Sequence, residues 1–191
     1  AWQDATVFEA VAMGIGGNNY YKNCYVDLKE SCLRSETTVK VFDQMRKLQG
    51  FTDEGSPGRD WNVATGMVIE GKAGFQIMGD WAKGEFTAAG KVPGVDYYCA
   101  PTPSNNGYLY NVDSFIFYKT SDPEKQEGQK LLAKLMMGKN FQKVFNLYKG
   151  SIPARLDVSM DEFDKCAKTS NADIKTAGAK GGPVPSFAHG M

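Results

Sequence analysis

The sequence contains a single histidine, His189, and no apolar run near the ~18 residues that a membrane-spanning helix needs. Basic and acidic residues number 22 each, so the chain has no net charge to attract nucleic acid. Its four cysteines include no Cys-x-x-Cys pair, and one histidine adds little to them as metal ligands. These absences argue against a nucleic-acid partner and against a metal centre.

The sequence also contains few of the motifs that indicate a catalytic site. It has no Gly-x-Ser-x-Gly elbow, and a nucleophilic triad would have to take His189, close to the end of the chain, as its base. Carboxylates are numerous, so a glycosidase-type acid and base pair stays open as an alternative. We therefore expect a protein that is not an enzyme, with a carbohydrate-active enzyme as the competing hypothesis.

One motif resembles a phosphate-binding loop, the G-x-x-x-x-G-K pattern of residues 66–72. Such a loop must follow a strand and open a helix, and it needs a Ser or Thr where this chain has Ala73. The local pattern instead predicts a helix over 61–70 and a strand over 73–78. The glycine-lysine pair would then close a helix, and we predict neither a nucleotide site nor any other cofactor.

Short strands that alternate with longer helices predict an α/β fold. The content of 42% hydrophobic and 12% aromatic residues is sufficient for a packed core. Helices are expected over 4–13, 61–70 and 81–89, and from capping residues Ser35, Ser121 and Ser159, with a further one after Gly138. The expected strands are 73–78, 97–100 and 114–118. Gly14, Gly16 and Gly17 are expected to end the first helix, and 18–32 to be irregular.

The four cysteines allow three pairings, and the sequence alone does not choose among them. Disulfides in an oxidising compartment explain an even number of cysteines, whereas buried thiols in the cytosol are the alternative. We favour Cys99 with Cys166, because a crosslink over that long a span contributes about 4 kcal/mol in the chain-entropy model. The short loop from Cys24 to Cys32 would contribute about 2.5 kcal/mol.

Five residues are candidates for ligand contacts, and each has a purely structural alternative. Trp81 stands where a strand is expected to give way to a helix, a place where α/β proteins bind ligands, but it is equally suited to a core. Asn111 and Asp113 precede an expected strand and would also suit a turn. Lys149 ends an expected helix, where its charge complements the helix dipole. His189 stands alone in a tail rich in glycine and proline.

The chain resembles the periplasmic solute-binding proteins of sugar ABC transporters, extracellular solute-binding family 1, which includes glucose- and mannose-type binders. The resemblance is carried by the run GRDWNVATGMVIEGKAGFQIMGDWAKGEFTAAGKVPGVDYYCAP, residues 58–101. It extends over almost the whole chain through AWQDATVFEAV, VDSFIFYK, YKGSIPARLDV and FAHGM. It implies a two-lobed type II periplasmic binding protein fold that holds a sugar in the cleft between α/β lobes.

The resemblance also implies roles for the five candidates. Trp81 would stack its ring on the C–H face of a monosaccharide, glucose or a similar hexose. Asp113, Lys149 and His189 would exchange hydrogen bonds with the sugar hydroxyls, and Asn111 is a weaker candidate for the same role. The implied partners are that monosaccharide and an ABC transporter permease, and the implied location is the periplasm.

Proteins of this family are much longer than this chain, so the resemblance implies a carboxy-terminal fragment. Residues 1–110 would be the first part of the carboxy-terminal lobe, and 111–158 a hinge crossover with a helical segment of the amino-terminal lobe. Residues 159–191 would return to the carboxy-terminal lobe and form the tail. An exposed interlobe surface would allow dimerisation. The alternative function is a fragment that keeps the fold without binding sugar and acts as an assembly or interaction module.

Overall fold

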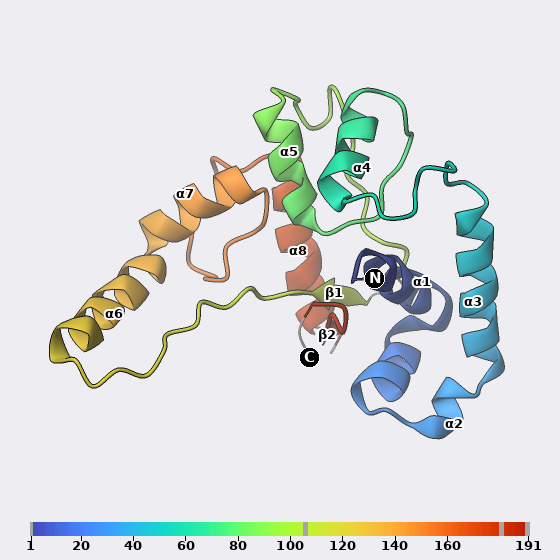
Figure 1. The fold of residues 1–191 in the computed structure, drawn as a ribbon, viewed down its shortest axis with the longest axis horizontal. Helices are drawn as coiled ribbons and strands as arrows, with labels where there is room; N and C mark the ends of the chain where they lie inside the picture. The colour runs from blue at the N-terminus through green and yellow to red at the C-terminus, as the bar shows by residue number, and fades with distance from the viewer. Residues whose placement is uncertain (1, 105–106, 180–181, 190–191) are drawn as a thin grey trace.

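The computed structural model describes residues 2–104, 107–179 and 182–189 and is mostly helical (Figure 1). Two short strands, β1 (Tyr108–Tyr110) and β2 (Pro183–Pro185), pair in parallel. The helical elements are α1 (Trp2–Tyr21), the π-helical turn η1 (Lys22–Val26), α2 (Glu30–Leu33), α3 (Glu36–Gln49), α4 (Trp61–Ile69), the 3-10 turn η2 (Asp80–Ala82), α5 (Lys83–Ala88), α6 (Pro123–Met136), α7 (Lys139–Lys149) and α8 (Lys165–Ala179). None of the described helices is long and apolar enough to cross a membrane.

The parallel pair of strands is the α/β element of this fold. Leu109 lies opposite Val184, and α8 packs against both strands. The strands expected over 73–78, 97–100 and 114–118 form no ladder in the described part of the chain, apart from an isolated bridge between Pro93 and Tyr97. A strand needs a neighbour for its backbone N–H and C=O groups. Without that neighbour these apolar runs remain irregular.

The main core lies between α1, α3 and β2. Its buried members are Val11, Ala12, Met13, Tyr21, Val41 and Val184. The first helix continues past its expected end at residue 13 but is broken at Gly17, one of the three glycines expected to end it, whose φ of 72° and ψ of −176° are not helical; a second helical stretch then runs to Tyr21. A Cβ on Gly16 would lie 2.0 Å from the Tyr20 ring. Gly16 therefore serves close packing within the helix and does not terminate it.

Two of the predicted helix boundaries are confirmed by their hydrogen bonds. Ser35 caps α3, since its Oγ accepts from the Thr38 backbone N–H at 3.4 Å. Helix α4 is followed by Gly71 in the left-handed region at φ 74°, and the Lys72 N–H donates to the Met67 carbonyl at 2.8 Å. The glycine-lysine pair thus closes a helix, as predicted from its sequence context, and does not open one.

Two other helix starts differ from the prediction by the identity of the capping residue. Helix α6 is capped by Asp122 and not by Ser121, with Asp122 Oδ1 accepting from the Glu124 N–H at 3.0 Å. Helix α8 begins after Asp164, whose Oδ1 accepts from the Ala167 N–H at 2.8 Å, so the expected cap at Ser159 is wrong. The negative charge of each aspartate also complements the dipole of the helix that it caps.

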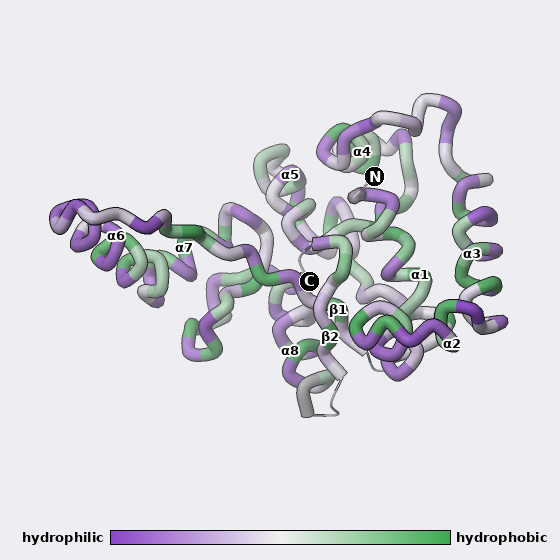
Figure 2. Tube along the Cα trace, turned by 60° about the horizontal axis from the view of Figure 1, so that its bottom comes forward, coloured by the Kyte–Doolittle hydropathy of each residue, from purple (hydrophilic) through white to green (hydrophobic). Residues whose placement is uncertain are grey.

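An extended stretch after β1 leads away from the rest of the molecule to α6, and α7 runs back from there to end against α5 (Figure 1). Hydrophobic residues recur along the segment 111–158 in Figure 2. Many of its large apolar side chains are exposed, namely Val112, Phe115, Ile116, Phe117, Tyr118, Leu131, Leu132, Leu135, Met137, Val144, Phe145, Tyr148 and Leu156. These exposed apolar side chains are too numerous to be the single, scattered ones that are normal on a protein surface.

Two disulfides crosslink the fold. Cys99 pairs with Cys166 across 67 residues, the pairing that we favoured from the sequence, and ties the segment before β1 to α8. Cys24 pairs with Cys32 and joins η1 to α2. A partly buried ion pair between Lys83 and Asp164, 2.7 Å apart, adds a further link between α5 and the start of α8.

Candidate functional site

Trp81 lies in η2 with its ring half-buried and folded back over Gly79. A Cβ placed on Gly79 would come within 2.0 Å of the Trp81 ring, so only glycine permits this pose. The centroid of the indole lies 4.9 Å from that of the His189 imidazole, with the planes at 67°, an edge-to-face arrangement. The structure therefore brings together two candidates that are more than half the chain apart in sequence.

His189 also contacts the first turns of α1. The Trp2 ring lies 5.5 Å from the imidazole at 73°, and Thr6 Oγ1 lies 3.4 Å from Nε2. The His189 side chain is 14% exposed, so part of the ring still reaches solvent. Sequence reasoning missed Trp2 and Thr6, because nothing near them in the chain shows that the tail folds back onto this helix.

The other three candidates form a second cluster. Lys149, at the end of α7, makes an ion pair with Asp113, and the Asn111 side-chain amide donates to Asp113 Oδ1 at 3.0 Å. Burial lowers the pKa of Lys149, and the nearby charge of Asp80 opposes that shift. Asn111 and Asp113 thus interact through their side chains without forming the turn of the alternative prediction, and Asp113 in addition reaches Lys149 across the fold.

Asp80 connects the two clusters. It directly precedes Trp81, and its Oδ1 accepts from Ser151 Oγ at 2.9 Å. Burial raises the pKa of Asp80, while the Ser151 hydrogen bond and the charges of Lys83 and Lys149 counteract the effect. A Cβ on Gly150 would lie 3.1 Å from the Asp80 carbonyl oxygen, so the end of α7 packs tightly against η2. Sequence analysis did not assign Asp80 this connecting position.

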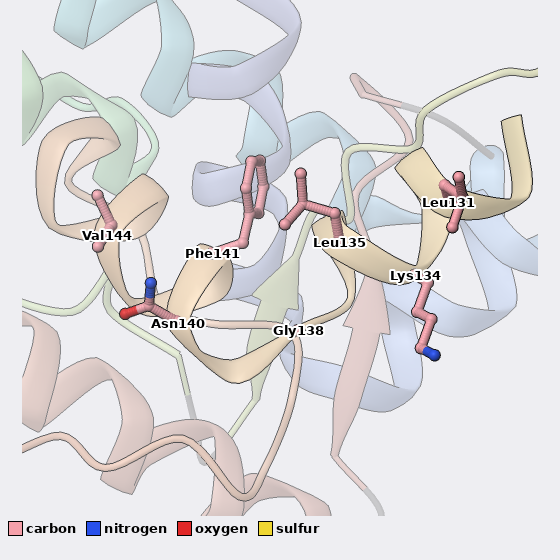
Figure 3. A pocket seen from close by; sticks show the side chains of 7 residues that line it. All are labelled: Leu131, Lys134, Leu135, Gly138, Asn140, Phe141 and Val144. Carbon is pink, nitrogen blue, oxygen red and sulfur yellow. The ribbon is translucent and has the colours of Figure 1, made fainter. Parts of the chain in front are cut away.

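A depression of about 550 Å³ lies elsewhere, on the α6–α7 hairpin, and none of the five candidates lines it. Figure 3 shows Leu135 and Phe141 side by side, while Lys134 points away from them. The complete lining is Leu131, Lys134, Leu135, Gly138, Asn140, Phe141 and Val144. Such an apolar lining offers few partners for sugar hydroxyls, so we do not assign the ligand to it.

Metal ligands do not gather in the described residues, where no group of three or more His, Cys, Asp or Glu could hold an ion. All four cysteines are taken up by the disulfides. The chemistry available at the two clusters is therefore aromatic stacking together with hydrogen bonding by charged and ring-nitrogen groups.

Replacing Gly79 with alanine is expected to push the Trp81 ring away from His189. Overpacking of this kind lowers the free energy of unfolding by about 1–3 kcal/mol, and it should also shift the ring resonances of His189. The matched control is Gly74→Ala, because a Cβ there meets nothing within 4 Å. Urea unfolding and NMR spectra test the pair, and equal behaviour of the two variants would contradict the described ring pose.

Comparison with known proteins gives one family and several relatives. Residues 2–175 match the family described as bacterial extracellular solute-binding protein. A probable sugar-binding periplasmic protein of Brucella suis is 47% identical over 190 residues, which is 99% of this chain and 45% of the relative. A protein of the same description from Rhizobium meliloti is 44% identical with the same coverage.

A more distant relative, the xylose/arabinose-binding protein of Haloferax volcanii, is 30% identical over 69% of this chain and 28% of its own length. The chain thus spans about 45% of the length of the bacterial relatives that it matches.

Proposed function

The chain belongs to the bacterial extracellular solute-binding proteins, and from this membership we propose that it contributes to binding a monosaccharide for delivery to an ABC transporter permease. Glucose or a similar hexose is the proposed ligand. The location is periplasmic, as the names of the relatives state, and the two disulfides fit an oxidising compartment. The observation that carries the proposal is the half-buried Trp81 ring beside His189.

The arrangement suits a pyranose for a physical reason. A sugar has an apolar C–H face and a rim of hydroxyls, each of which both donates and accepts hydrogen bonds. Trp81 offers the flat apolar surface, and His189, Asp113 and Lys149 offer polar partners, with Asn111 as an auxiliary one. Hydrogen bonds to charged groups contribute roughly 1.5–3 kcal/mol each, and a wrong epimer would leave one of them unmade.

We propose the same division into lobes that the resemblance implies. Residues 1–110 and 159–191 would belong to the carboxy-terminal lobe, and 111–158 would cross to the amino-terminal lobe. The exposed apolar side chains of 111–158 support this division, because the larger part of a protein as long as the relatives would be available to cover them. Closing of the lobes on the sugar would be a hinge motion.

The same apolar surface leads us to propose that the chain by itself dimerises. Light scattering over a range of protein concentrations tests this, with a rise in mass toward the dimer as the expected result. A mass that stays at the monomer value throughout would contradict it.

Isothermal titration of the protein with a panel of hexoses and pentoses tests the sugar assignment. We expect one hexose to bind in the micromolar range and its epimers to bind more weakly. Circular dichroism of the same samples serves as the control for folding. No heat from any sugar in folded protein would favour the assembly or interaction module, and a changed sugar recovered by chromatography would favour an enzyme.

A further inference from the structure

Behind the His189 ring lies a buried polar network that the proposed binding function does not by itself require. Its centre is Glu9 on α1, which is only 3% exposed. Ser186 Oγ donates to Glu9 Oε1 at 2.6 Å, and Tyr21 Oη donates to Oε2 at 3.0 Å. The Ala188 backbone N–H adds a longer bond of 3.4 Å to Oε2. A carboxyl group is thus held inside the protein by donors from α1 and from the tail.

The direction of these bonds determines what Ser186 offers to His189. Ser186 Oγ lies 2.9 Å from Nδ1 of the imidazole. A hydroxyl has one proton, and the proton of Ser186 is committed to Glu9. Ser186 must therefore accept at its other side, and Nδ1 of His189 must carry the hydrogen. In a neutral histidine only one ring nitrogen carries hydrogen, and the hydrogen bonds made by the ring determine which one it is.

The Tyr21 hydroxyl is a second donor beside Glu9, with the Pro185 carbonyl oxygen at 3.2 Å as its alternative acceptor. Burial raises the pKa of the Tyr21 hydroxyl, with the nearby Glu9 charge adding to the shift, so this group keeps its proton and donates. Nδ1 of His189 itself lies 3.7 Å from Glu9 Oε1, which adds an electrostatic preference for hydrogen on the same nitrogen. The Ser186 hydrogen bond and the Glu9 charge therefore both favour hydrogen on Nδ1.

The opposite nitrogen, Nε2, is left as an acceptor. Thr6 Oγ1 is its neighbour at 3.4 Å, but the Thr6 hydroxyl donates to the Trp2 carbonyl oxygen at 3.1 Å. Its single proton is therefore used on α1. Nε2 lies on the ring that contacts both Trp2 and Trp81.

We propose that Glu9 is a positioning residue, acting through Ser186, that fixes His189 with hydrogen on Nδ1 so that Nε2 accepts a hydrogen bond from a ligand hydroxyl. This inference rests on the proposed function only for the identity of the ligand. The tautomer itself is a property of the sugar-free protein. A hydroxyl that binds Nε2 must donate, so fluorine, which cannot donate, is a poor replacement for it.

The test uses the fact that this chain has one histidine. Nitrogen-15 NMR of the uniformly labelled, sugar-free protein gives one imidazole pattern, and we expect a protonated, pyrrole-type Nδ1 and a pyridine-type Nε2. Ser186→Ala removes the oxygen 2.9 Å from Nδ1 and leaves only the weaker 3.7 Å contact with Glu9 Oε1, so the hydrogen should shift toward Nε2. Ser186→Thr retains the hydroxyl and should preserve the wild-type pattern. Ser159→Ala, an exposed serine on another loop, is the control that should change nothing.

Two results would overturn the inference. One is hydrogen on Nε2 in the wild-type protein, and the other is an unchanged imidazole pattern in Ser186→Ala. Because Glu9→Leu carries a larger risk to folding, it is used as a second variant only in samples whose circular dichroism matches the wild type. In Glu9→Leu the Ser186 hydroxyl loses its acceptor and can donate to Nδ1 instead, so the imidazole pattern should change as it does in Ser186→Ala.

Titration with monofluorinated hexoses forms a separate arm. At one ring position fluorine should weaken binding about tenfold, corresponding to about 1.4 kcal/mol, and this penalty should shrink to less than threefold in Ser186→Ala. If fluorine weakened binding equally in the wild type and in Ser186→Ala, this would contradict the positioning of His189 by Glu9 through Ser186. Silence with every sugar would count against the proposed function, whereas the imidazole spectrum would still report on Glu9 and Ser186.

Discussion

Trp81→Ala is expected to raise the Kd for the proposed hexose ligand roughly 30-fold. The indole is half-buried and stands edge-to-face with His189, so its removal deletes the apolar platform and one wall that orients the imidazole. The loss of buried apolar contact is on the order of 2 kcal/mol, and each 1.4 kcal/mol corresponds to about a factor of ten in Kd. Isothermal titration measures the change directly.

Two further variants separate stacking from general damage. Trp81→Phe keeps an aromatic face and should retain most of the affinity. Phe51→Ala removes an aromatic ring that is 86% exposed beyond the end of α3, and it should bind like the wild type. A Trp81→Ala protein that binds the hexose as tightly as the wild type would remove Trp81 from the site.

Removal of the Cys99–Cys166 disulfide, by replacing both residues with alanine, is expected to lower the free energy of unfolding by about 4 kcal/mol. The crosslink spans 67 residues, and a loop of that length strongly restricts the unfolded chain in the chain-entropy model. Cys99 is exposed, so the change removes little packing on that side. Urea unfolding without reductant measures the difference.

A reducing buffer provides the control for the disulfide experiment. Reductant opens both disulfides of the wild type and the remaining Cys24–Cys32 disulfide of the double variant, so in the same reducing buffer the two unfolding curves should approach each other. A difference of several kcal/mol that persists under reduction would show that side-chain packing, and not the crosslink, is responsible.

Helix boundaries with a strong local cause could be predicted from the sequence. Gly71 closes α4 because a left-handed residue is needed there, and Ser35 caps α3 because its hydroxyl reaches a free N–H. Gly17 does break the helix, as its residue type indicated, whereas Gly16 lies inside the helix and allows the Tyr20 ring to pack against it. The sequence pattern did not show which of these glycines would break the helix.

The candidate site was predictable only in part. Trp81 and His189 were selected separately, and the structure brings their rings to 4.9 Å. Trp2, Glu9 and Ser186 were missed, because each gains its role from the return of the tail to α1. The strand expected over 114–118 did not form for a different reason, because an apolar run indicates burial but does not show which strand would pair with it.

The contact between Thr6 and His189 joins positions that are 183 residues apart in sequence. Contacts of such high sequence separation form only after most of the chain has been organised, because closing a long loop costs entropy before it gains energy. Trp2 and Trp81 both lie against that imidazole, so their fluorescence would record one of the last steps in refolding. A partly folded chain would have its core helices and still lack the contacts around His189 on which the proposed sugar site depends.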